Sequence, residues 1–174
     1  MVQTILSTRI HVLTALVAGA ILAVCATATN AATLNWNVAG PADWASGGNW
    51  NPPGFPPGTV DVADISNGGT AYIDSNVGTI QRFEMAAPVG TSGFLEIRSG
   101  GSLTTNNSGN TYVGSRGVGV LTIEPGATLN VGPGAFYVGR RGDGGAHGDG
   151  TVIQNGGSVT VGRNIDLAQN DANT

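Results

Sequence analysis

The chain has 174 residues, a formal net charge of −4 at pH 7, seven arginines, no lysine and 29 glycines. This acidic balance disfavours nucleic acid as a partner, because proteins that bind a polyanion present a surplus of basic side chains. The single cysteine, Cys25, excludes intramolecular disulfides, so backbone hydrogen bonds and packing must stabilise the fold.

Residues 1–32 have the pattern of a secretory signal peptide, which predicts a short helix that is removed on export. Arg9 precedes the apolar run Val12–Cys25, which is too short to span a bilayer comfortably. Small residues follow, and cleavage is expected within Ala28–Ala32. The alternative, a lipoprotein signal that lipidates Cys25, is disfavoured because Val24 is larger than the residue usually found before such a cysteine.

The mature chain of 142 residues is long enough for one domain and has six arginines against eleven acidic residues, a net charge of about −5. No membrane span is expected in it. Its many glycines and asparagines, with scattered Val, Ile and Leu, predict short strands joined by tight turns, because Gly and Asn tolerate positive φ angles.

Residues 33–62 contain most of the prolines and all three tryptophans, Trp36, Trp44 and Trp50. We expect an N-terminal cap in which these rings, with Phe55, plug the open end of a repeat structure. The alternative is that the three tryptophans form a sugar-stacking platform, because flat aromatic faces suit pyranose rings.

Residues 63–174 contain internal repeats. The segments Leu95–Thr105, Leu121–Val131 and Thr151–Val161 align without gaps, and Asp64–Tyr72 is a looser fourth copy. A second shared element follows each of the three close copies, at Thr111–Gly117, Phe136–Gly142 and Ile165–Asp171. Each copy therefore predicts three short strands.

Apolar residues alternate within each copy, which is typical of strands with one buried face. Like residues recur in columns, such as Leu103, Leu129 and Val159. Glycines at fixed places, such as the pair Gly100-Gly101, suit sharp corners between the strands. The sequence therefore predicts an all-β, parallel β-solenoid (β-helix) of about four rungs, and the alternative is an antiparallel sandwich of hairpins. The last copy stops partway, so we expect a truncated chain with further rungs or an anchor beyond residue 174.

These motifs resemble those of bacterial exported proteins with autotransporter-associated and PEP-CTERM-associated β-strand repeats. The resemblance implies a right-handed solenoid outside a bacterial cell, with a structural or adhesive role, as in an adhesin or a biofilm matrix, and with extracellular polysaccharide or cell-surface components as partners. The translocator barrel or Pro-Glu-Pro sorting helix of that family is not seen in these 174 residues, so attachment to a surface stays open. The resemblance is carried by Trp36, Trp44, Gly48–Trp50, Pro56-Pro57, Asp61–Ile65, Asn67–Ile73, Tyr112–Gly132 and Gly148–Gly162.

Catalysis deserves consideration because pectin-degrading enzymes share the β-helix architecture and need carboxylates that converge on one face. Glu96 and Glu124 occupy the second and fourth positions of their copies, and we expect them to point to opposite faces of the strand. No catalytic residue is therefore predicted, and the alternative function is a carbohydrate-binding or polysaccharide-processing β-helix.

The most polar segment follows Gly139. Arg141-Gly142-Asp143 spells a cell-adhesion tripeptide, and Gly144–Val152 resembles the nonapeptide of calcium-binding β-rolls, with Asp143 and Asp149 as candidate ligands. It departs from that nonapeptide at His147 and at its seventh position, and it occurs once. We expect a tolerated surface insertion without a cofactor, with calcium as the alternative.

Overall fold

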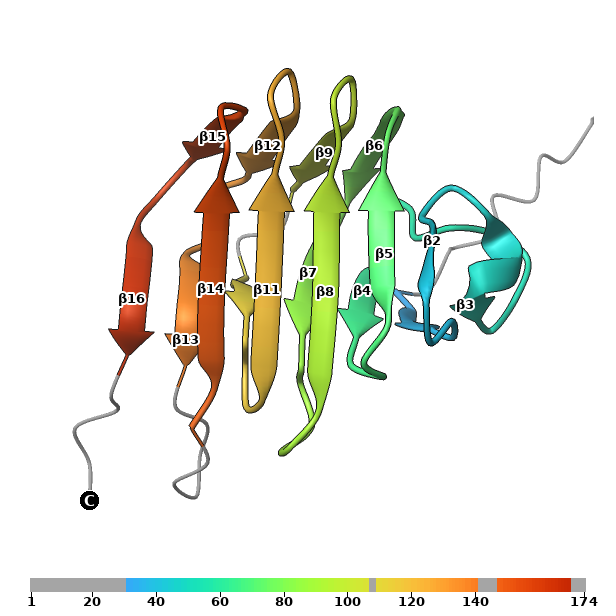
Figure 1. Cartoon of the computed structure of the whole chain (residues 1–174), viewed down its shortest axis with the longest axis horizontal. Helices are drawn as coiled ribbons and strands as arrows, with labels where there is room; N and C mark the ends of the chain where they lie inside the picture. Colours follow the sequence, from blue (N-terminus) through green and yellow to red (C-terminus); the bar gives the residue numbers. More distant parts are fainter. Residues whose placement is uncertain (1–30, 107–108, 141–146, 170–174) are drawn as a thin grey trace, which may run out of the picture.

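The computed structural model describes residues 31–106, 109–140 and 147–169. These residues form an all-β, parallel β-solenoid of about five turns, which confirms the expected fold class. Figure 1 shows the turns stacked in chain order from the cap, in blue and cyan, to the last strands, in red. The predicted signal peptide lies almost wholly outside the described residues, among which no helix is long and apolar enough to cross a membrane.

Three sheets run along the solenoid, and each complete turn contributes one strand to each sheet. Sheet A, from the cap end, consists of β3 (Trp50–Asn51), β1 (Thr33–Trp36), β4 (Val62–Ile65), β7 (Arg82–Met85), β10 (Thr111–Val113), β13 (Phe136–Arg140) and β16 (Ile165–Gln169). Sheet B consists of β2 (Pro41–Asp43), β5 (Thr70–Ile73), β8 (Ser92–Ile97), β11 (Val118–Ile123) and β14 (Asp149–Gln154). Sheet C consists of β6 (Asn76–Ile80), β9 (Ser102–Thr105), β12 (Thr128–Val131) and β15 (Ser158–Val161).

The apolar alternation of the sequence builds the core. Leu95 and Ile97 of β8 lie beside Leu121 and Ile123 of β11, and all four are at most 1% exposed. Leu103, Leu129 and Val159 form the expected column in sheet C, and Val113, Val138 and Leu167 form the one in sheet A. Since a strand's side chains alternate between its two faces, every second residue enters the shared core and its neighbours face outward.

The corner glycines also lie as expected. Gly100, Gly126 and Gly156 stand at the same corner of successive turns with φ angles of 84°, 79° and 131°. These angles fall in the left-handed region, where a residue with a β carbon is strained, so glycine is the residue that turns the chain there.

The cap is part of the solenoid, which corrects the boundary expected at residue 62. Strand β1 pairs in parallel with β4, and β2 pairs in parallel with β5, so the stacking begins at Thr33. After β2 the chain leaves the repeat through a short 3-10 helix, η1 (Gly47–Asn49), and returns as β3, which pairs antiparallel with β1. The added turn explains why there are about five turns rather than the expected four.

The looser copy at Asp64–Tyr72 does not lie where its alignment predicts. Ile65 lies in sheet A beside Met85, whereas the alignment predicts it in the sheet that contains Ile97. The residue that pairs with Ile97 is Ile73, at the end of β5. The corner Asn67-Gly68-Gly69 causes the difference, because it resembles the glycine pair of the later copies but joins a different pair of sheets.

The first strand of the third close copy, β14, is offset by one residue from the alignment, whereas its second strand, β15, pairs as aligned. Leu121 pairs with Val152 rather than with Thr151, so Val152 faces the core, Gln154 lies in the column of Ile123, and Ile153 faces outward with 42% exposure. A shift of one residue moves every side chain of a strand to the other face.

A column of glycines explains this offset. Gly93, Gly119 and Gly150 lie side by side at the start of the sheet B strands, and Gly69 lies below them, its carbonyl accepting the N–H of Phe94. A β carbon on Gly93 would lie 1.8 Å from the carbonyl oxygen of Ile65. Because only glycine fits at this position, these glycines set the register of the sheet B strands. In β14 they do so although Gln154, and not an apolar residue, then lies in the column of Ile123.

Candidate functional site

The three tryptophans form one enclosed cluster at the cap. Trp36 is 3% exposed, and Trp44 and Trp50 are 0% exposed. The rings meet edge to face, with centroids 5.0 Å apart for Trp36 and Trp50 and 4.7 Å apart for Trp44 and Trp50. The indole Nε1 of Trp50 donates a hydrogen bond of 2.8 Å to the carbonyl oxygen of Trp44.

This burial decides between the two interpretations of the tryptophans. A sugar can stack only on an aromatic face that solvent reaches, so Trp36, Trp44 and Trp50 do not provide the glycan contacts that were considered. They close the end of the core, as the plug hypothesis predicted. Phe55 corrects that hypothesis in one respect, because its side chain is 82% exposed and lies outside the plug.

The polar segment after Gly139 is described only at its ends. Asp143, with the rest of the adhesion tripeptide, lies outside the described residues. Asp149 is the first residue of β14, pairs with Val118 and is exposed, and His147 is exposed nearby. In the parts of the chain that the structure describes, no three His, Cys, Asp or Glu side chains gather as metal ligands. Calcium binding by Asp143 and Asp149 therefore stays an untested alternative to the expected insertion without a cofactor.

The two glutamates considered for catalysis each have a partner. Glu96 accepts a hydrogen bond of 2.8 Å from Arg98, whose guanidinium also lies 3.9 Å from the centre of the Tyr72 ring. Glu124 accepts one of 3.0 Å from the side-chain amide of Asn155. Both glutamates are partly exposed, which corrects the expected opposite faces, because the second and fourth positions of a strand share one face.

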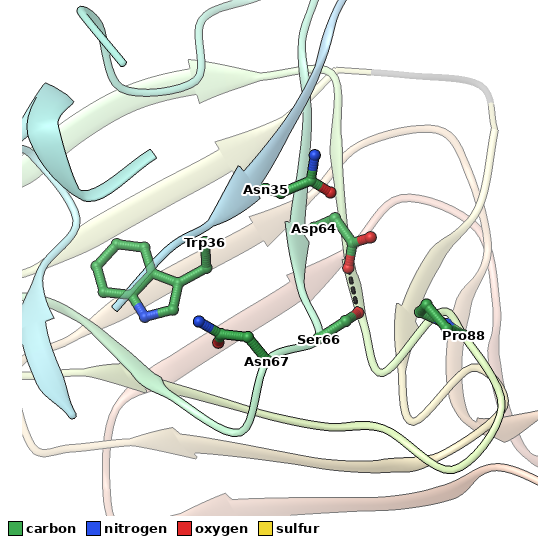
Figure 2. Close-up of a pocket in the computed structure, with 6 residues that line it drawn as sticks. All are labelled: Asn35, Trp36, Asp64, Ser66, Asn67 and Pro88. Carbon is green, nitrogen blue, oxygen red and sulfur yellow. Dashed lines mark hydrogen bonds between the residues drawn. The ribbon is translucent and has the colours of Figure 1, made fainter. Parts of the chain in front are cut away.

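A polar pocket on the outside of sheet A was not predicted. Its volume is about 220 Å³, and it opens to solvent beside the cap. Figure 2 shows the residues that line it, which come from β1, from β4 and the corner after it, and from the corner that follows β7. They are Asn35, Trp36, Asp64, Ser66, Asn67 and Pro88.

Asp64 is the ionisable group of this pocket. Its carboxylate accepts a hydrogen bond from the hydroxyl of Ser66, which in turn accepts one of 3.0 Å from the backbone N–H of Ala87. Burial raises the pKa of Asp64 above its usual value of 3.8, the bond from Ser66 opposes this, and the nearby charge of Glu84 adds to it. The carboxyl group therefore takes up a proton more readily than an ordinary aspartate.

The neighbouring carboxylate differs because it has a counterion. Glu84 lies beside Asp64 in the next turn, and its Oε1 is 2.8 Å from the guanidinium of Arg82. Among the described residues the ion pairs are this one and that of Arg98 with Glu96, so neither includes Asp64. The carboxylate of Asp64 can therefore accept further hydrogen bonds from a ligand.

Two further polar side chains border the pocket. Asn67 donates a hydrogen bond of 3.2 Å to the carbonyl oxygen of Val38 and accepts one of 3.0 Å from the N–H of Gly69, so both ends of its amide are held. The indole Nε1 of Trp36 is buried and has no hydrogen-bond partner in the described part of the chain. Figure 2 shows the nitrogen-bearing edge of this ring facing Asn67.

The outer face of sheet A continues from the pocket as a polar and aromatic column. Tyr112 lies beside Glu84, Tyr137 beside Tyr112, and Asp166 beside Tyr137. The two tyrosine rings stack with centroids 5.2 Å apart, and Arg140 lies 5.2 Å from the centre of the Tyr112 ring. Burial, and then the charge of Asp166, raise the pKa of Tyr137. The rings contact one another, so this column stabilises the turns.

The pocket suits a small hydroxylated molecule, because a carboxylate and an asparagine can accept and donate hydrogen bonds next to a hydrophobic wall. Asp64 belongs to a motif used for the resemblance, but nothing in the sequence showed that Asn35 and Asn67 lie next to it. No protein family, curated protein or solved structure matched the chain in comparisons with each.

Proposed function

We propose that the chain is an exported, non-catalytic β-solenoid with a structural or adhesive role outside the cell. The observation that carries this proposal is the continuity of the stack: three parallel sheets share one apolar core from the cap to β15. The outward carboxylates considered for catalysis are engaged by Arg98 and Asn155, so they support the turns around them.

Export is tested by fusing residues 1–32 to alkaline phosphatase, which is active only where its disulfides form. We expect activity outside the cytoplasm of a bacterial host, and its loss when Val12–Cys25 is deleted. A fusion that stays inactive, although it accumulates, contradicts the proposal.

The absence of catalysis is tested with the purified mature chain and pectin or another acidic polysaccharide. We expect no turnover. Turnover that disappears in Glu96→Gln or Glu124→Gln would show that the chain is an enzyme.

Carbohydrate binding is the second candidate function, and the polar pocket favours it. The hydroxyls of a neutral sugar would donate hydrogen bonds to Asp64 and exchange them with Asn35, while Pro88 provides apolar contact. Such a pocket would make the solenoid adhesive at its capped end.

This candidate is tested by saturation-transfer NMR with neutral hexasaccharides of glucose and of mannose. We expect transfer to the sugar protons that weakens at least threefold in Asp64→Ala. The matched control is Asp74→Ala, which removes an exposed aspartate away from the pocket. Equal transfer in both variants, or none with any sugar, rules this candidate out and leaves the structural role.

A further inference from the structure

The polar pocket beside the cap carries one charge. Of the residues that line it, Asp64 is the ionisable one, and it has no ion pair with another described residue. Glu84, its neighbour in the next turn, lies 2.8 Å from the guanidinium of Arg82, so those two charges offset each other. The pocket therefore presents a partly buried carboxylate without a counterion.

Most of the hydrogen-bond donors at the pocket are not available to a ligand. The hydroxyl of Ser66 donates to Asp64, and the amide nitrogen of Asn67 donates to the carbonyl oxygen of Val38. The indole N–H of Trp36 belongs to a ring that is 3% exposed, so a ligand does not reach it. What remains open is chiefly acceptor capacity, because an ionised carboxylate has about four lone-pair positions and Ser66 occupies one.

A ligand that matches this arrangement supplies donors and a positive charge. A primary ammonium group has three N–H donors and no acceptor, and it is the counterion that Asp64 lacks. Its attraction to a carboxylate is stronger in a partly buried site than in open water, because the protein lowers the effective dielectric constant. A neutral hydroxyl has one donor and no charge, so it matches the pocket less well.

We infer that the sugar is an amino sugar, whose ammonium group pairs with Asp64, and this rests on the carbohydrate binding proposed for the pocket. Asn35 is exposed and lies beside Asp64 on the neighbouring strand, and such strands are about 4.8 Å apart. An ammonium group and a hydroxyl group on adjacent ring carbons therefore reach Asp64 and Asn35 together.

The apolar side of the pocket holds the sugar ring. Pro88 lines the pocket from the corner that follows β7, and Figure 2 shows it across the pocket from Trp36. The volume of about 220 Å³ is smaller than the roughly 300–1,000 Å³ of pockets for drug-sized ligands. The pocket therefore suits a single sugar ring.

Three single-ring ligands test the role of the charge: the methyl glycosides of glucosamine and of glucose, and cyclohexylamine. NMR titrations of the signal-free chain measure their affinities at a pH between the pKa of Asp64 and that of the amine. We expect the glucosamine glycoside to bind at least tenfold more tightly than the glucose glycoside, which has a hydroxyl group in place of the ammonium group. We expect the same advantage over cyclohexylamine, which has the charge and a six-membered ring but no hydroxyl groups.

The possible failures are distinguishable. Equal affinity for the two glycosides overturns the preference for an amino sugar and leaves carbohydrate binding standing. Cyclohexylamine that binds as tightly as the glucosamine glycoside shows an amine site that does not recognise sugars, which overturns both. Binding of neither glycoside also overturns both.

Variants of the two neighbouring residues test the placement of the sugar. Asp64→Asn keeps the size of the side chain and removes its charge, so the tenfold preference should disappear. The matched control Asp74→Asn changes an exposed aspartate away from the pocket and should retain the preference. Asn35→Ala truncates an exposed residue, which should leave the fold intact and weaken both glycosides at least threefold without removing the preference. A preference that survives Asp64→Asn, its equal loss in both aspartate variants, or unchanged affinities in Asn35→Ala overturns this arrangement.

Discussion

Gly150 lies so close to Gly139 that a β carbon on Gly150 would stand 2.1 Å from the backbone nitrogen of Gly139. That distance is far below any van der Waals contact, so the start of β14 and the end of β13 fit together only when Gly150 has no side chain. Similarly close approaches to backbone atoms occur at Gly69, Gly93 and Gly119, at the corners that lead into β5, β8 and β11.

The first prediction follows from the column of glycines formed by Gly69, Gly93, Gly119 and Gly150. Gly93→Ala should lower the free energy of unfolding by about 1–3 kcal/mol, because the added methyl group has to displace the backbone of Ile65. Gly40→Ala is the matched control, since Gly40 occupies the same corner in the first turn and a β carbon added there would meet no atom within 4 Å. Urea unfolding measures both, and equal stability of the two variants contradicts the role of the column.

The second prediction concerns the cap. Trp44→Ala should cost about 3–5 kcal/mol of stability, since it empties a fully buried space against which Trp50 packs. Phe55→Ala should change stability by less than about 0.5 kcal/mol, because that ring is exposed. Thermal unfolding followed by tryptophan fluorescence checks both, and the native chain should show a blue-shifted spectrum that acrylamide quenches poorly. Ready quenching would place the rings in solvent.

The third prediction is a pH dependence that comes from Asp64. Its pKa is raised in the folded state, so the folded chain binds more protons than the unfolded chain between pH 3.8 and the raised value. Stability from this group is present at low pH and is lost as the pH rises through that window. Asp64→Asn should therefore flatten the dependence. Urea unfolding at several acidic pH values measures this, with Asp74→Asn as the control, and an unchanged slope in Asp64→Asn contradicts it.

The fourth prediction concerns calcium. We expect a calorimetric titration of the purified chain to give no heat and no change in melting temperature, because the nonapeptide occurs once and departs from its pattern at His147. A saturable heat that disappears in Asp149→Asn would show that the segment binds calcium after all.

The sequence predicted the stacking because columns such as Leu103, Leu129 and Val159 are visible as a repeat. It did not predict the register of β14, because the alignment compared apolar side chains, whereas the glycine column decides the register through contacts that a side chain would prevent. It also missed the pocket around Asp64. That pocket brings Asn35 and Trp36 of the cap next to Asp64–Asn67 and Pro88, and no pattern in the sequence connects these three separate segments.

The corner after β13 has a further consequence. The N–H of Gly148 donates a hydrogen bond of 2.8 Å to the carbonyl oxygen of Arg140, so the chain leaves and re-enters the stack at nearly the same point. Gly150 then sets the register of β14 against β11, whatever the length of the chain between Arg140 and Gly148. The entropic cost of a longer loop grows only slowly with its length. A foreign peptide inserted between Arg140 and Gly148 would therefore be displayed on the side of an unaltered rod, which makes this corner a site for carrying epitopes or tags.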